Sequence, residues 1–160
     1  MIHKVSELPA AELLALSDTP ENSLTLVLLL DQIARNIKRG PEAAWAYTHS
    51  DPAALHVLHH CLRIGHDKAH PPHKRFWYYL GLSHSENMLD QELALARSST
   101  LTWEIRTTEW KSFHGVLRDS TKYIIKFYTT IDKFGRFPQR NEVLKRESTA
   151  EEEEFLKSWN

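Results

Sequence analysis

The stretch Leu28–Gly40, LLLDQIARNIKRG, begins as an apolar helix and then places polar side chains on every face. A set of apolar residues recurs through it and just before it at helical spacing, namely Leu26, Leu30, Ile33 and Ile37. This spacing predicts a helix with one face buried in a core. Asp18 or Thr19 can cap its start, with Pro20 in the first turn, and Gly40-Pro41 ends it.

A second stripe of the same helix is charged. Asp31, Arg35 and Arg39 follow one another at intervals of four residues, so their side chains share one face. In a packed helical fold, an isolated buried charge costs on the order of several kcal/mol. The stripe therefore requires polar partners from other segments of the chain.

Comparable signals predict helices along the rest of the chain. The segments are Glu42–Tyr47, Asp51–Gly65, Pro71–Glu92 broken near Ser85 into two antiparallel arms, Thr108–Lys133, Asn141–Arg146, and a last helix that a capping box opens at Ser148–Glu151. Five glycines in 160 residues leave little material for hairpins. We predict a single all-α domain over residues 1–160, with about seven to nine helices in stacked antiparallel pairs.

The bulk composition excludes several classes of partner. Twenty basic and twenty-one acidic residues give a formal charge of -1, which offers no general attraction for nucleic acid or an anionic membrane. The longest apolar run, Leu24–Leu30, is far short of the ~20 residues that span a bilayer. Cys61 is the only cysteine, which favours a reducing, cytoplasmic location. We predict a soluble protein that binds neither nucleic acid nor membrane.

Six histidines fall within residues 56–73, but they do not predict a metal site. His56 and His60 share a helix face at a spacing that can bind zinc. The apolar face of that helix lies opposite, so both histidines are expected to face solvent, and neither a cysteine ligand nor an HExxH pattern completes a site. We expect no metal, and because no cofactor motif or nucleotide loop is visible, no cofactor.

The segment HSENMLDQ, residues 84–91, gathers further candidates for chemistry. His84, Ser85 and Glu86 are adjacent, and adjacent side chains on a helix diverge by about 100°, which excludes a catalytic triad within the segment. Glu86 and Asp90 share a face and repel each other unless a cation lies between them. We expect an arginine of another helix there; the alternative is a solvated acidic face.

The segment KFGRFPQRNEVLKREST, residues 133–149, predicts a loop that carries arginines. Gly135 permits a left-handed turn, and Pro138 stiffens the chain that follows. Arg136 and Arg140 are then held in place, and each guanidinium can form a fork with a carboxylate of the protein or of a ligand.

Together these segments resemble the domain of unknown function 924, a bacterial-type, all-helical family with a tetratricopeptide-like fold. The family motif LLLDQxxRNxxRG is matched here by Asp31, Gln32, Arg35, Asn36, Arg39 and Gly40. The motif GHD with PPxxR is matched by Gly65, His66, Asp67, Pro71, Pro72 and Arg75, and HSExxxDQ by His84, Ser85, Glu86, Asp90 and Gln91. The motif RFGRFPxRN with REST is matched by Phe134–Pro138, Arg140, Asn141 and Arg146–Thr149. Their order and spacing agree over residues 20–157. The resemblance implies a fold and no particular activity.

The sequence also departs from the pattern of the family it resembles. Family members usually begin with an aromatic-rich segment, and we expect this chain to lack it. Gln139 and Phe127 stand where the family commonly has histidines, and Ala34 stands where it commonly has proline. Two potential acid–base groups are therefore missing.

The resemblance leads to the hypothesis of a polar centre. In it Glu86 and Asp90 meet Arg35 and Arg39, while the remaining polar atoms are satisfied by amides, namely Gln32, Asn36, Gln91 and Asn141.

One interpretation of this centre is a cofactor-independent lyase, isomerase or cyclase. His84 would transfer a proton, with Glu86 or Asp90 orienting it. An anionic group of the substrate would be bound by Arg35, Arg39, Arg136 or Arg140.

The alternative interpretation is a non-catalytic module that binds a peptide on the concave face of a tetratricopeptide-like stack and uses the charges only to fix its helices. A homodimer could cover apolar surface in either case. The sequence identifies neither the substrate nor the partner.

Overall fold

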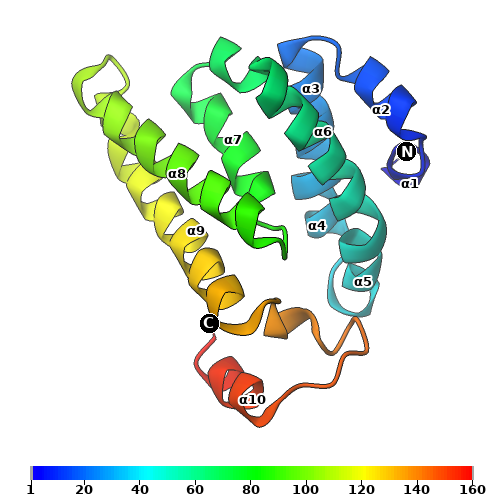
Figure 1. Ribbon diagram of the computed structural model, residues 1–160. Helices are drawn as coiled ribbons and strands as arrows, with labels where there is room; N and C mark the ends of the chain where they lie inside the picture. Colours follow the sequence, from blue (N-terminus) through cyan, green and yellow to red (C-terminus); the bar gives the residue numbers. More distant parts are fainter. Residues whose placement is uncertain (1, 160) are drawn as a thin grey trace.

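A computed structural model describes residues 2–159, which form helices and no strand (Figure 1). The α-helices are α1 (Ile2–Ser6), α2 (Ala10–Leu16), α3 (Pro20–Val27), α4 (Ala34–Ile37), α5 (Ala43–Trp45), α6 (Asp51–Ile64), α7 (Pro72–Leu82), α8 (Met88–Glu104), α9 (His114–Phe134) and α10 (Ala150–Lys157). The predicted all-α class is confirmed. The tetratricopeptide-like stacking of the helices stays a prediction.

Two of the helices contain a widened π-helical turn. Leu28–Ile33 joins α3 to α4, and Ala46–Ser50 joins α5 to α6. Helix α6 begins at Asp51, as predicted, but no side chain caps it, because the chain is already helical through Ala46–Ser50.

Local signals place most of the other helix ends. Thr19 caps α3 by accepting a hydrogen bond from the Asn22 N–H at 3.1 Å, and α9 ends at Gly135, whose φ of +66° suits glycine. The predicted break near Ser85 separates α7 from α8. The capping box of α10 is Thr149 with Glu152, one residue later than predicted. The start of the long helix was predicted too early, since α9 begins at His114 after short 3₁₀ turns.

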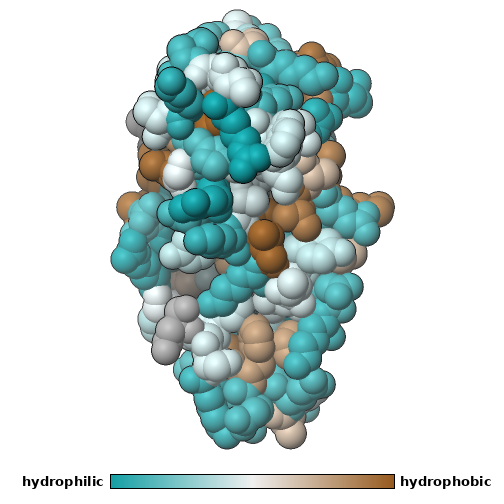
Figure 2. Space-filling view, turned by 90° about the vertical axis from the view of Figure 1, so that its left-hand side faces the viewer, coloured by the Kyte–Doolittle hydropathy of each residue, from teal (hydrophilic) through white to brown (hydrophobic). Residues whose placement is uncertain are grey.

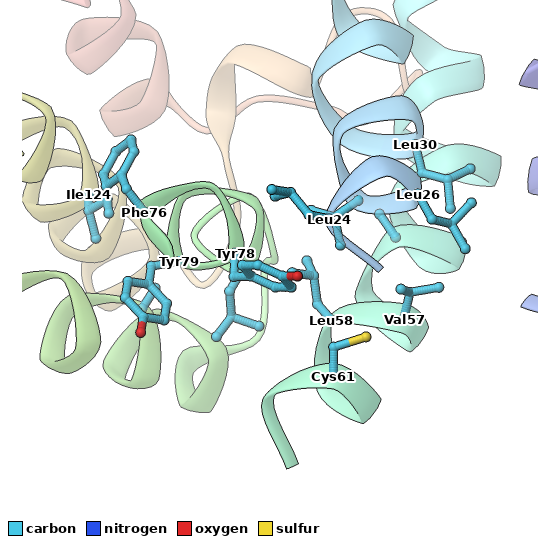
Figure 3. Close-up of a cluster of buried hydrophobic side chains, with 14 of the residues drawn as sticks. Leu24, Leu26, Leu30, Val57, Leu58, Cys61, Phe76, Tyr78, Tyr79 and Ile124 are labelled. Atoms are coloured by element: carbon cyan, nitrogen blue, oxygen red, sulfur yellow. The ribbon is translucent and has the colours of Figure 1, made fainter. Parts of the chain in front are cut away.

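The core lies where α3, α6, α7 and α9 converge (Figure 3). Its fully buried side chains include Leu30, Leu58, Tyr78, Tyr79 and Ile124. The lone cysteine is buried among them as a free thiol. Within residues 2–159, no helix has both the length and the apolar character that crossing a bilayer would require.

The predicted apolar stripe around Leu30 is only half right. Leu26 and Leu30 are buried, but Ile33 and Ile37 are 47% and 55% exposed. The cause is the π-helical turn Leu28–Ile33, which has more residues per turn than an α-helix and so carries the buried face from Leu30 to Ala34 instead of to Ile33. Asp31 is turned toward the core by the same change and is only 1% exposed.

This register gives unequal roles to two positions that the sequence pattern treats alike. Leu30→Ala should lower the free energy of unfolding by about 2–5 kcal/mol, because it opens a cavity in a packed core. Ile37→Ala should change it by no more than about 0.5 kcal/mol. Urea unfolding of both variants measures the difference, and equal losses would show that the helix keeps an α-helical register.

Candidate functional site

Five charged or titratable side chains from four separate segments of the chain lie close together. Arg35 donates from Nε to Asp31 Oδ1 at 3.1 Å and from Nη2 to Asp51 Oδ1 at 2.7 Å. His84 Nδ1 lies 2.6 Å from Asp31 Oδ1, and Arg140 Nη1 lies 3.6 Å from Asp51 Oδ2. We call Asp31, Arg35, Asp51, His84 and Arg140 the polar centre.

The two π-helical turns position this centre. Leu28–Ile33 contains Asp31, and Ala46–Ser50 comes directly before Asp51. A hydrogen bond links the two turns, because Ser50 Oγ donates to the Leu30 carbonyl at 2.6 Å. π-Helical turns of this kind are frequent at functional sites because they change the direction of the side chains that follow.

Helix α7 approaches the centre closely at Gly81. A Cβ atom at this position would lie 3.1 Å from Leu58 Cδ1 and 3.6 Å from the Asp31 carboxylate. The absence of a side chain on Gly81 therefore lets α7 pack against Asp31 and brings His84, two residues after the end of that helix, within hydrogen-bonding reach.

Burial and charge shift the pKa values of the centre in different directions. Burial alone would raise the pKa of Asp31, but His84 and Arg35 outweigh it and hold that pKa well below its usual range. Burial, only partly offset by Arg35 and Arg140, raises the pKa of Asp51. Burial, together with the charge of Arg35, lowers the pKa of Arg140 to about 10.

His84 is held as a neutral base. Burial lowers its pKa, and the charge of Arg35 adds to that effect. Because Asp31 is ionised, the neutral ring donates its Nδ1–H to that carboxylate and leaves Nε2 unprotonated. Within residues 2–159, Nε2 has no hydrogen-bond partner. It is also not fully buried, so it keeps contact with solvent.

A cavity of about 160 Å³ adjoins the polar centre. It is lined by Tyr47, Asp51, Pro52, Leu55, His84, Ser85, Glu86 and Arg140. The Arg140 guanidinium lies between the Tyr47 and Phe137 rings, 4.5 Å from each centroid, and donates from Nη2 to the His84 carbonyl at 2.7 Å. Since a water takes up about 30 Å³, the cavity has the volume of about five waters and suits a small polar group.

Two more atoms beside the cavity lack hydrogen-bond partners in the described part of the chain. Arg140 Nη1 and the buried Asp51 Oδ2 make no hydrogen bond, and they face each other at 3.6 Å as an ion pair. The residues that line the cavity therefore include an imidazole with an unprotonated nitrogen and an arginine whose Nη1 makes an ion pair with Asp51 but no hydrogen bond. This set can accept a proton from a bound molecule and stabilise an oxygen that becomes negative.

The structure corrects the predicted partners of Glu86 and Asp90. Neither pairs with Arg35 or Arg39. Glu86 accepts two hydrogen bonds from Arg146, at 2.8 and 3.0 Å, and one from the Phe137 N–H at 2.8 Å. Asp90 lies 2.7 Å from His59 Nε2.

The physical reason for this error is the shape of the connection between α7 and α8. Asn87 caps α8, so Glu86 precedes the helix and does not share a helical face with Asp90. Arg39 lies beyond the end of α4, is exposed, and donates to Asn36 Oδ1 at 2.6 Å. It therefore does not reach the polar centre.

The predicted amides and the remaining arginine are divided between four places. Gln32 donates to Asp31 and so joins the centre, whereas Asn36 is exposed. Gln91 donates to the Ser83 and Ser85 carbonyls, at 2.6 Å each, and fixes the turn that carries His84. Asn141 and Arg136 both bind Glu152 at the start of α10, away from the centre.

Sequence reasoning missed three residues of this region. Asp51 stands at the start of the predicted helix Asp51–Gly65, and nothing in the local sequence indicates that it belongs to the polar centre. Tyr47 gave no signal. Arg146 lies in the REST segment that carried the resemblance, and that segment was the only pointer to it. In residues 2–159, no cluster of three or more histidine, cysteine, aspartate and glutamate side chains could hold a metal ion.

The fold and the site thus define an all-α protein with a buried network of charged side chains. The chain belongs to the family described as "Bacterial protein of unknown function (DUF924)", whose model matches residues 2–160, and the predicted resemblance is confirmed. It is similar to a solved structure of a protein of unknown function from Agrobacterium tumefaciens, with 32% identity and a TM-score of 0.72 over 92% of this chain and 74% of that one. No curated protein matches the chain.

The lowered pKa of His84 predicts a specific dependence of stability on pH. Below the unfolded pKa of about 6.5, the unfolded chain binds more protons at this residue than the folded protein does. Wild type should therefore lose stability as the pH falls through that value toward the folded pKa. His84→Asn keeps a donor for Asp31 but cannot titrate, so it should lack this loss.

Thermal unfolding of both proteins between about pH 7.5 and 5.5 tests the prediction. The Tm of wild type minus that of His84→Asn should shrink as the pH falls. A difference that grows toward acid pH would mean that folding raises the pKa of His84.

Proposed function

We propose that this protein is a cofactor-independent enzyme that moves a proton on a small substrate bearing a carbonyl or carboxylate group, as a lyase, isomerase or cyclase does. The observation that carries the proposal is His84, whose Nδ1 is held 2.6 Å from Asp31 while Nε2 stays free beside the 160 Å³ cavity. A histidine in this arrangement can act as a general base, because its ring is neutral and one nitrogen is unprotonated.

The proposed roles follow from the atoms beside the cavity. His84 Nε2 takes a proton from the substrate, and Asp31 orients the ring and stabilises the imidazolium that forms. Arg140 Nη1 donates to the substrate oxygen that gains negative charge, which gives the anionic group of the predicted substrate a partner. The proton then returns from His84 to a neighbouring atom in an isomerase or cyclase, or leaves with the departing group in a lyase.

Other residues have supporting roles in this proposal. Tyr47 and Phe137 hold the Arg140 guanidinium between them, and Glu86 binds Arg146 at the rim of the cavity. Gln32 and Gln91 position Asp31 and the turn of His84. Asp90, Arg39, Arg136, Asn36 and Asn141 lie outside the centre and take no part in the chemistry.

One observation favours the alternative of a non-catalytic interaction module. Asp31, Arg35 and Asp51 enclose essentially no free space where they meet, so that half of the centre has the packing expected of a structural ion-pair network. In that case the charges hold the helices and a peptide or protein partner binds elsewhere. The cytoplasmic location and the homodimer stay predictions under both proposals.

The His84→Asn variant separates the two functions. It retains the bond to Asp31, so it should melt close to wild type at neutral pH, but it lacks the base and should turn over substrate about 10²–10⁴-fold more slowly. The assay incubates each protein with a metabolite extract and follows the compounds consumed by liquid chromatography and mass spectrometry.

His56→Asn is the matched control, because His56 is an exposed histidine of α6 that does not line the cavity. It should consume the same compounds at the wild-type rate. If wild type consumes nothing, or if a well-folded His84→Asn protein is as active as wild type, the enzymatic proposal is wrong.

A further inference from the structure

A second cleft, separate from the polar centre, lies between the end of α8 and the first half of α9. It measures about 320 Å³, within the range of roughly 300–1,000 Å³ typical of small-molecule sites. The side chains that matter here are Trp103 at the end of α8, Arg106 in the following turn, and His114, Arg118 and Lys122 on α9. The cleft shares no lining residue with the cavity beside His84.

The basic side chains form a stripe along α9. His114, Arg118 and Lys122 follow one another at intervals of four residues and so share one helix face. Like charges in this arrangement destabilise a free helix, and an anion between them removes that repulsion. Figure 2 looks onto this side of the molecule, formed by α8 and α9, where hydrophilic side chains surround small apolar areas.

The cleft carries more positive charge than its neighbours neutralise. No aspartate or glutamate is among the described residues that line it. Arg118 and Lys122 share one carboxylate, Asp119, at 3.4 and 2.9 Å, and both pairs are exposed and therefore weak. Arg106 takes part in no ion pair within residues 2–159.

An aromatic surface stands beside these charges. Trp103 is 69% exposed, which is unusual for tryptophan, and the Arg106 guanidinium lies 4.8 Å from its ring centroid. A flat indole and a flat guanidinium both stack on planar rings and tolerate many ring types. The cleft therefore combines a stacking surface with a cationic one.

We propose that this cleft binds a small aromatic anion of the size of a nucleoside monophosphate. The planar ring stacks on Trp103 and Arg106, and the phosphate is held by Arg118 and Lys122 on the α9 stripe. The volume suits one ring system with one anionic group. The site does not depend on the acid–base chemistry proposed for His84.

The test titrates the full-length protein with adenosine monophosphate, adenosine and inorganic phosphate by isothermal calorimetry. Wild type should bind the monophosphate more tightly than either of its parts. Trp103→Ala should weaken that binding by roughly tenfold through loss of stacking, and Arg118→Gln with Lys122→Gln should weaken it at least as much. These side chains are exposed, so all variants should keep the wild-type Tm.

Lys133→Gln is the matched control, because Lys133 is an exposed lysine of α9 paired with one carboxylate, Glu151, outside the cleft. It should bind like wild type. The proposal is overturned if wild type does not bind the monophosphate at about 1 mM. It is equally overturned if phosphate alone binds as tightly, or if Lys133→Gln weakens binding as much as the charge variant does.

Discussion

The carboxylate of Asp31, buried and ionised in the middle of a helical core, is the constraint on which the rest of this structure depends. It accepts hydrogen bonds from Gln32, Arg35 and His84. Each donor adds a polar group that needs its own partner. The charge of Arg35 is compensated by Asp51, and the charge of Asp51 is compensated by Arg140 as well. Arg140 in turn donates a hydrogen bond to the main-chain carbonyl of His84. Removing one member of such a buried network leaves another charge unpaired, at a cost of about 3–5 kcal/mol.

The backbone adapts to this network in three places. The π-helical turn Leu28–Ile33 directs Asp31 inward, the second turn Ala46–Ser50 presents Asp51, and Gly81 lets α7 pack against the carboxylate. The ion pair between Glu86 and Arg146 fixes the loop after α9, and this holds Arg140 in position. The same contacts leave His84 Nε2 without a hydrogen-bond partner, and for this reason we propose that a network that stabilises the fold also performs proton transfer.

Local sequence signals predicted the helix ends and turns that depend on only a few neighbouring residues. The cap at Thr19, the left-handed Gly135 and the break near Ser85 each depend on one or two residues, and all three were predicted correctly. The charged stripe and the resemblance to a known family led to the hypothesis of a polar centre, but they did not predict that Asp31 pairs with His84 or that Arg140 pairs with Asp51. The errors concern tertiary geometry. A π-helical turn has no clear residue code, so Ile33 and Ile37 were expected inside, and the partners of Glu86 depend on where α8 begins.

The measurement that most directly tests the account is the protonation state of His84 by ¹H–¹⁵N NMR at neutral pH, with the resonances assigned by their loss in His84→Asn. The account predicts a neutral imidazole that carries its proton on Nδ1, bound to Asp31, with Nε2 unprotonated. An imidazolium, or a neutral ring protonated on Nε2, would contradict it, because neither state leaves a base facing the cavity.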